Sequence, residues 1–355
     1  ARGRYIALLN NDAVPDPGWL DELVRTIERD DSTAAVTSKL VFYTPFVRIG
    51  LHPVEGAEIG SVAPSILIGG SSSFAGSAYD KMVLLEGSRP VPAGDEQHLL
   101  PFGADSTLYL PSPPGVDDEV LQLTVAALEP TARATIAVFV GEEEIGRLDL
   151  GERAGKAELI VPRRLIDDAA IDLINNAGTE LADDGSAADR GIWQPDDGRY
   201  DDPTEVSAFC GAAVLLRARA IAEVGAFDRD FFTYFEDTDL SWRLRSRGYR
   251  LLYQPSARAR HRHAATSVEG SRSFRFHVAR NRILMLVKNG TPGAFLRAYL
   301  SELRRFVVAM VPRPRRVDEP RPDWASELGL RCRVQLSLLL RIPRALLKRM
   351  GWLAH

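Results

Sequence analysis

Cysteine and long apolar runs are both scarce in this sequence. The 355 residues include two cysteines, Cys210 and Cys332, which are too few for a disulfide framework and favour a reducing compartment. A membrane span needs roughly 18 apolar residues, and the longest candidate segments, at 306–311 and 336–340, are far shorter. Hydrophobic residues make up 45% of the chain and charged residues 26%, so we expect an ordinary globular protein with a buried core.

Charge is unevenly distributed along the chain. The net charge is −4, yet residues 290–355 contain 13 Lys and Arg against five Asp and Glu. This basic tail suggests an anionic partner surface, either a membrane or a nucleic acid. Its two predicted amphipathic helices could lie in a membrane interface, or equally well pack against the rest of the chain. The acidic body and the lack of an aromatic–basic motif argue against nucleic acid.

Residues 1–44 alternate between strand, turn, helix and strand. The run RYIALL at 4–9 predicts a buried strand, and residues 19–29 and 34–40 predict an amphipathic helix and a second strand. Such alternation is typical of a parallel α/β layer. Because the chain opens inside a strand and has no initiator Met, we expect a partial sequence whose N-terminal segment is missing.

Residues 45–169 have a different pattern, rich in Gly, Pro and Ser. Apolar residues recur at every second position in several short segments, such as 121–125 and 136–140, which predicts an inserted antiparallel β-sandwich. The α/β pattern resumes at 170–289, with a strand predicted over 206–217 and helices over 218–224, 239–247 and 273–289. The predicted organisation is therefore an α/β domain formed by 1–44 and 170–289, the sandwich at 45–169, and a helical tail at 290–355.

The triplet Asn10-Asn11-Asp12 directly follows the first predicted strand. Ligands bind beyond the carboxyl ends of strands in open α/β sheets, and a carboxylate there can hold a hard divalent cation. An Asx turn with no ligand explains the same residues.

A second cluster of polar residues lies in FFTYFEDTDLSWRLR at 231–245. Glu236, Asp237 and Asp239 stand at a predicted helix start beneath aromatic residues, where burial shifts carboxyl pKa values and one group can serve as a general base. Capping of the helix by Thr238 or Asp237 is the alternative.

Three further features are ambiguous by themselves. His261 and His263 follow a predicted strand and could bind a metal or be solvated. Gly211 could let a substrate approach the backbone, or mark a bulge. The segment Arg280–Arg282 could bind phosphates or be a solvated helix face.

In order and spacing, these segments resemble the inverting family 2 glycosyltransferases of GT-A fold, especially the rhamnosyltransferase- and galactofuranosyltransferase-like members. The resemblance rests on YIALLNNDAVPDPGWLDELV, INNAGTELADDG, FCGAAVLLR and VGAFDRDFFTYFEDTDLSWRLRSRGYRLLYQPSARARHRH. It covers about 1–44 and 170–290, close to half of the chain. It implies an α/β fold, a Rossmann-like GT-A domain that here lacks its first strands. In the family, these first strands belong to a unit that binds the nucleotide.

The resemblance also implies roles for individual residues. Asp237 would be the general base, beside Glu236, and Asp12 would contact a metal on the diphosphate, with His261 as a second ligand. The remaining family positions would bind the donor or border the acceptor: Asn10, Asn11, Gly211, Trp242 and Arg243.

The implied reaction transfers a sugar from a nucleoside diphosphate (UDP- or dTDP-linked) to a surface or cell-wall glycan, or a lipid-linked acceptor, with Mg²⁺ or Mn²⁺. A cytoplasmic protein, peripheral on the inner face of the plasma membrane through its tail, would suit such an acceptor. The alternative is a non-catalytic carbohydrate-binding protein that uses the inserted sandwich.

Overall fold

The structure is a computed structural model that describes part of the chain in detail. The described residues are 2–55, 61–68, 82–85, 91–92, 106–112, 119–126, 134–150, 154–262, 270–312 and 324–351. His263 lies outside them.

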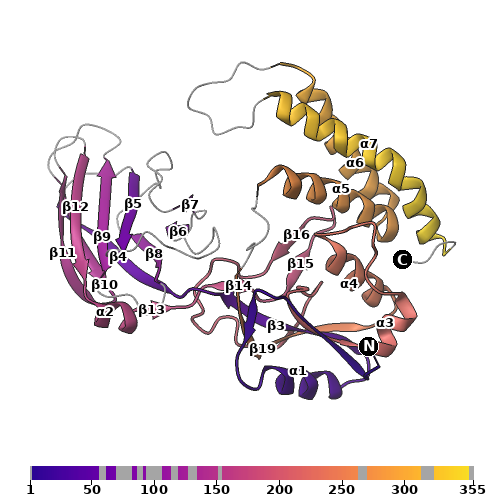
Figure 1. Ribbon diagram of the computed structural model, residues 1–355, viewed down its shortest axis with the longest axis horizontal. Coiled ribbons are helices and arrows are strands. Elements are labelled where there is room, and N and C mark those ends of the chain that lie inside the picture. Colours follow the sequence, from indigo (N-terminus) through magenta and orange to yellow (C-terminus); the bar gives the residue numbers. More distant parts are fainter. Residues whose placement is uncertain are drawn as a thin grey trace.

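A mixed sheet forms the base of the molecule (Figure 1). The order of its main strands is β1-β18-β3-β19-β17, with β14 paired to β3 and β2 to β19. These strands are β1 (Tyr5–Leu9), β2 (Ala13–Pro15), β3 (Thr33–Phe42), β14 (Ile174–Asn176), β17 (Thr204–Glu205), β18 (Ala213–Arg217) and β19 (Arg250–His261).

The prediction of a parallel layer is only partly right. β3 and β19 pair in parallel, but β18 lies antiparallel between β1 and β3. Helix α1 (Trp19–Glu28) connects β1 to β3. Because β18 is antiparallel to both strands, β1 and β3 run in the same direction, as expected for strands joined by a helical crossover. β18 arrives much later in the chain and fills the gap between them.

Helix α1 covers one face of this sheet. Leu23 and Ile27 are fully buried against β3, β18 and β19, as the amphipathic pattern predicts. The indole N–H of Trp19 donates to Ser38 Oγ at 2.7 Å, which fixes the start of the helix to β3. The neighbouring Gly18 has φ 80°, a conformation that favours glycine.

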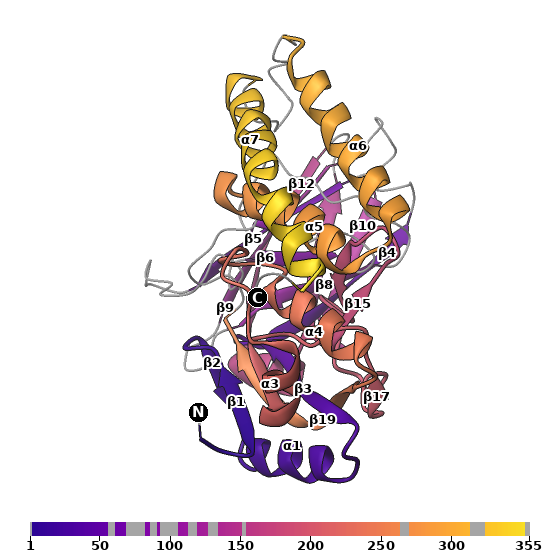
Figure 2. The ribbon, with the colours of Figure 1, turned by 90° about the vertical axis from the view of Figure 1, so that its right-hand side faces the viewer.

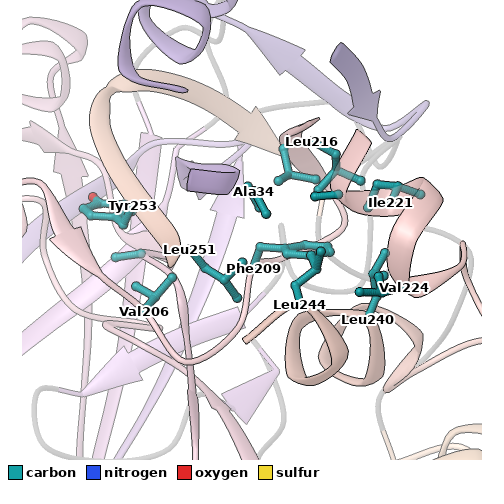
Figure 3. Packing of buried hydrophobic residues seen from close by; sticks show 14 of the residues in the cluster. Ala34, Val206, Phe209, Leu216, Ile221, Val224, Leu240, Leu244, Leu251 and Tyr253 are labelled. Carbon is teal, nitrogen blue, oxygen red and sulfur yellow. The ribbon is translucent and has the colours of Figure 1, made fainter. Parts of the chain in front are cut away.

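The other face of the sheet packs on helices α3 (Ala218–Val224) and α4 (Glu236–Ser246). Figure 3 shows Phe209 among residues of the sheet and of α4. The buried cluster joins Ala34 and Leu251 of the sheet with Leu240 and Leu244 of α4. This packing fixes the position of α4 on the sheet, and with it the acidic residues at the start of the helix.

The described strands between residues 46 and 161 pair in antiparallel fashion and lie on the left of Figure 1. One sheet has the order β11-β10-β4-β8-β6-β7 with β13 on β4, and a second has the order β12-β9-β5. The predicted period-two segments at 121–125 and 136–140 lie on β9 (Glu119–Ala126) and β10 (Ala134–Val140). The other members are β4 (Phe46–Glu55), β5 (Ser61–Ile68), β6 (Met82–Leu85), β7 (Val91–Pro92), β8 (Ser106–Pro111), β11 (Glu143–Leu150), β12 (Ala154–Val161) and β13 (Ala170–Ile171).

This strand-rich region has its own hydrophobic core. Ile49, Leu108, Ile136 and Val138 are buried there, together with residues of the short helix α2 (Arg163–Asp168). A two-stranded hairpin of β15 (Thr179–Leu181) and β16 (Ala187–Asp189) follows in the chain.

Three helices complete the described chain: α5 (Arg272–Asn289), α6 (Pro292–Ala309) and α7 (Trp324–Arg349). They lie together above the mixed sheet in Figures 1 and 2, and α7 packs on both α5 and α6. In the stretches that the structure describes, no helix combines the length and apolar content needed to cross a bilayer.

Candidate active site

A cleft of about 880 Å³ opens beside the mixed sheet, at the carboxyl ends of β1 and β19. Segments far apart in the sequence line it: the loop after β1, the hairpin β15–β16, the loops at 210–212 and 232–235, the start of α4, and the start of α5. The predicted site residues among them are Asn10, Asp12, Gly211, Glu236, Asp237 and His261. The cleft thus brings both predicted acidic clusters to one place.

Asp237 is held by backbone N–H groups. Gly211 N donates to its Oδ2 at 3.1 Å, and Thr238 N donates to its Oδ1 at 2.7 Å. Burial raises the pKa of Asp237, although these hydrogen bonds oppose the shift. The result is a carboxylate fixed in orientation but more basic than an exposed aspartate, which suits a group that accepts a proton.

Glu236 lies next to Asp237 in the same cleft. Burial, followed by the charge of Asp237, raises the pKa of Glu236 to about 7. Its Oε2 is buried without a hydrogen-bond partner. The pKa values of both neighbouring carboxyl groups are therefore raised, and burial is the largest cause for each.

The acidic residues do not cap the helix, contrary to the alternative left open by the sequence. The N-cap of α4 is Phe235 at φ 70°, with no side-chain hydrogen bond. Asp239 is fully buried, bonded to Arg243, Lys288 and Asn289. Its role is therefore structural, whereas Glu236 and Asp237 face the cleft.

The loop before α4 has an unusual backbone. Phe232, Tyr234 and Phe235 all have positive φ values between 64° and 70°, a conformation that costs roughly 1–3 kcal/mol for each non-glycine residue. The amide of Asn281 on α5 holds this loop, since its Nδ2 lies 2.7–3.0 Å from the carbonyl oxygens of residues 231, 233 and 234. Such maintained strain is common at functional sites.

The segment Arg280–Arg282 therefore has a different role from both of those considered in the sequence. Arg280 and Asn281 are buried and donate to carbonyl oxygens of the loop before α4. Arg282 donates to Asp184, in the turn between β15 and β16. These side chains fix two walls of the cleft.

Asp12 and His261 lie on opposite sides of a short gap within the cleft. His261 Nε2 is 3.5 Å from Asp12 Oδ1, an atom that is buried without a hydrogen-bond partner. On the other side of the ring, Nδ1 lies 2.9 Å from Asn175 Oδ1. Because that oxygen can only accept, Nδ1 carries a proton, and Nε2 is the ring nitrogen that faces Asp12.

This donor set fits a divalent cation. A carboxylate oxygen and an imidazole nitrogen face each other, and the second ring nitrogen is oriented by an oxygen, the usual arrangement around a metal-bound histidine. Within the described ranges, no group of three or more His, Cys, Asp or Glu side chains is arranged as a metal site. Further ligands would then come from substrate oxygens or water, as is common for Mg²⁺.

Three of the predicted site residues do not line the cleft. Asn11 is exposed, and Trp242 packs into the core between α4, α5 and α7. Arg243 is buried, paired with Asp239, and donates to the carbonyl oxygens of Val224 and Gly225. The structure thus corrects the expectation that Trp242 and Arg243 border the substrate, because their side of α4 faces the interior.

The cleft also contains residues that the sequence analysis did not single out. Asn175 bonds His261, and Asn176 at the end of β14 donates to Asp189 of β16 at 2.7 Å. Phe232 lines the cleft with an 82% exposed side chain. The first two belong to INNAGTELADDG, a segment recognised by its resemblance alone, and only its position against the cleft reveals a role.

The part of the chain that includes α4, with Glu236 and Asp237, is similar to known proteins. Residues 197–282 match the family model described as Glycosyl transferase family group 2. N-acetylglucosaminyl-diphospho-decaprenol L-rhamnosyltransferase of Mycobacterium tuberculosis is 40% identical over 65 residues, which are 18% of this chain and 21% of that protein. Rhamnosyltransferase WbbL of Escherichia coli is 37% identical over 98 residues, 25% of this chain and 37% of that protein.

The matches support a family 2 glycosyltransferase. The chain covers well under half the length of these relatives. The family 2 glycosyltransferase match includes Gly211, Glu236, Asp237 and His261 but not Asp12, which joins them only through the fold.

Proposed function

We propose that this chain contains the acceptor side and the metal-binding side of an inverting glycosyltransferase. The observation that carries the proposal is that Asp12 and the Glu236–Asp237 pair line one cleft, although more than 200 residues separate them in sequence. A cation-binding carboxylate and a basic carboxylate in one cleft are what sugar transfer from a nucleoside diphosphate requires.

In this proposal Asp237 is the general base. It accepts the proton of the acceptor hydroxyl while that oxygen attacks the anomeric carbon of the donor sugar. The bond from this carbon to the diphosphate oxygen breaks on the opposite face, so the configuration inverts. The N–H groups of Gly211 and Thr238 orient the base, and a positioned base typically contributes 10²–10⁴-fold in rate.

The donor side of the proposal involves Asp12 and His261. These residues would hold Mg²⁺ or Mn²⁺, which when bound neutralises charge on the departing diphosphate. Asn10 and Gly211 also line the cleft, and the lack of a side chain at Gly211 would let the sugar approach its backbone. A UDP- or dTDP-linked sugar is the proposed donor.

The acceptor is proposed by analogy with the relatives. The mycobacterial protein is named for an acceptor in which a sugar is attached to a lipid through a diphosphate. We extend this chemistry to the present chain and place its activity at the cytoplasmic face of the plasma membrane. Exposed apolar residues on α6 and α7, such as Leu300, Leu339 and Leu340, support contact with a lipid surface.

Substitution of the base tests the proposal. In the full-length protein, we expect Asp237→Asn to lower kcat about 10²–10⁴-fold, measured as sugar transfer with donor, acceptor and Mg²⁺. Asp183→Asn, an exposed aspartate on the β15–β16 turn, is the matched control and should retain normal turnover. Near-normal turnover by Asp237→Asn, in a folded protein, would exclude Asp237 as the base.

A further inference from the structure

A second cavity, of about 560 Å³, lies beside the cleft, between the loop before α4 and helices α5 and α7. Four arginines line it, and Asp230 is the only acidic residue among the described lining: Arg229, Arg280, Arg333 and Arg341. No residue of the proposed transfer chemistry belongs to this cavity. Its charge therefore needs a separate explanation.

The single carboxylate is already neutralised by its own partners. Asp230 bonds Arg341 at 2.8 Å, Lys348 at 2.6 Å and Arg344 at 3.1 Å. The cavity is therefore strongly positive. Burial and the nearby Arg341 lower the pKa of Arg280 to about 10, and burial and Arg280 lower the pKa of His277. A site of this kind attracts an anion with several oxygens, which guanidinium groups bind in pairs.

The remaining walls of the cavity are apolar and exposed. Leu336 and Leu340 of α7 are 60% and 72% exposed, and both line the cavity beside the arginines. A small inorganic anion would make no favourable contact with these leucine side chains. A ligand with a charged head and an apolar chain would contact both kinds of wall.

Phe232 connects this cavity to the cleft. Its side chain lines both, and its ring centroid lies 5.5 Å from that of His277. A ligand in the arginine cavity can therefore extend past Phe232 toward Asp237. The strained loop that carries Phe232 is fixed by Asn281, so this boundary is built into the fold.

We propose that the arginine cavity binds the diphosphate of a lipid-linked acceptor. Arg229 and Arg333, which line the cavity and are exposed, contact the phosphate oxygens, whereas Arg280 keeps its bonds to the loop before α4. The lipid chain lies over Leu336 and Leu340, and the attached sugar passes Phe232 to reach Asp237. The assignment rests on the proposed glycosyl transfer, and it adds where and by which residues the acceptor is held.

Binding of a short lipid diphosphate tests the assignment without turnover. Farnesyl diphosphate, inorganic pyrophosphate and farnesol are each titrated into the full chain below micelle-forming concentrations. We expect farnesyl diphosphate to bind at least about tenfold more tightly than either of the others, because only it meets both walls. Equal binding of pyrophosphate would overturn the lipid assignment.

Two variants locate the binding. Arg333→Gln and Leu340→Ser, both at exposed cavity positions, should each weaken farnesyl diphosphate about tenfold. Arg247→Gln removes an exposed arginine outside the cavity and should bind as tightly as the unmodified chain. Arg333→Gln indistinguishable from Arg247→Gln would refute the site.

A competition experiment separates a lipid-linked substrate from ordinary membrane lipid. We expect phosphatidylglycerol in the same assay to displace little farnesyl diphosphate, and equal displacement would identify a general membrane contact and overturn the proposal. Because binding is read directly, its failure is distinct from failure of sugar transfer. If the enzyme transfers sugar but Arg333→Gln binds farnesyl diphosphate normally, the cavity assignment alone is refuted. If no sugar transfer is found, the binding results remain valid by themselves.

Discussion

At the scale of single residues, the clearest feature is the pair of neighbouring carboxyl groups of Glu236 and Asp237, both with raised pKa values. Burial raises the pKa of both, and the charge of Asp237 adds to the shift at Glu236, whose pKa is about 7. Electrostatic coupling is reciprocal, so an ionised Glu236 also makes Asp237 harder to ionise. The pair, not one residue, sets the pH at which the base becomes available.

Glu236→Gln tests this coupling. A general base works only when ionised, so kcat/KM falls as pH drops through the pKa of the pair. Removal of the negative charge of Glu236 makes ionised Asp237 easier to form and lowers its pKa. We expect the acid limb of the pH–rate profile to move down by about one unit.

The control is Glu180→Gln, an exposed glutamate on β15, whose acid limb should match that of the unmodified enzyme. An acid limb of Glu236→Gln that stays in place would show that the two groups titrate independently.

Residue types and spacing predicted the acidic pair, but not which neighbours share its surroundings. Resemblance indicated Asp237 and Trp242 with equal force, because both belong to one motif. The helical period separates them: Asp237 faces the cleft, whereas Trp242 lies on the side of α4 that packs on α5 and α7. This orientation depends on where α4 begins, and the sequence placed its start three residues late, at Asp239.

At the scale of elements, the segment at 206–212 shows why an apolar run is ambiguous. A strand was predicted over 206–217, yet only Ala213–Arg217 is a strand. Three successive N–H groups before it bond side chains instead of a neighbouring strand: Phe209 N to Ser241 Oγ, Cys210 N to Thr37 Oγ1, and Gly211 N to Asp237 Oδ2. These partners come from distant segments, so no local pattern indicates them.

The helical tail at 290–355 is a larger segment whose sequence pattern was also ambiguous. Both membrane docking and packing agreed with its sequence, and packing does occur. Lys348 of α7 is buried against Asp228, which also bonds Lys288 of α5 at 2.7 Å. Burial alone would raise the pKa of Asp228, but the hydrogen bonds from Lys288 and Lys348 outweigh it and hold that pKa well below its usual range.

Loss of one lysine from this network should destabilise the fold. We expect Lys348→Met to lower the free energy of unfolding by about 3 kcal/mol, because it leaves buried Asp228 with one fewer cationic partner. Urea unfolding measures the change. Arg344→Met, which removes an exposed partner of Asp230, should change stability by less than about 1 kcal/mol, and equal effects would show that α7 is not held by its buried charge.

At the scale of the whole molecule, the sequence predicted the types of elements better than their assembly. Helix α1 and the strands of the β-rich region arise from local hydrophobic periodicity. The place of β18 between β1 and β3 requires residues from 177 to 212 positions apart to pair, and no periodicity encodes that. The cleft is a product of this long-range assembly, as it joins the ends of β1 and β19 to α4 and the β15–β16 hairpin.

The assembled tail also leaves one of its apolar faces uncovered. Leu296, Leu300 and Val307 on α6 are each more than half exposed, at spacings that place them on one side of the helix. Arg304 and Arg305 are exposed on the same helix. Packing of α7 and docking of α6 on a membrane are therefore compatible, since they use different residues.

Membrane contact through α6 gives the last prediction. Substitution of Leu296, Leu300 and Val307 together by serine should reduce flotation of the protein with anionic vesicles by at least about tenfold, because each loses apolar area that the interface would bury. Deletion of 290–355 is a poor test, as it would also remove Lys348 and its buried ion pairs. The triple serine variant leaves that network in place.

The matched control substitutes three exposed apolar residues remote from α6: Leu20, Val54 and Ile160. It has the same number of serine changes, so a general loss of surface hydrophobicity would reduce flotation equally in both variants. Selective loss in the α6 variant would assign the contact to this helix. Unchanged flotation of the α6 variant would refute membrane contact through α6. The proposed active site between Asp12 and Asp237 would be unaffected by that result, because none of the cleft lining belongs to α6.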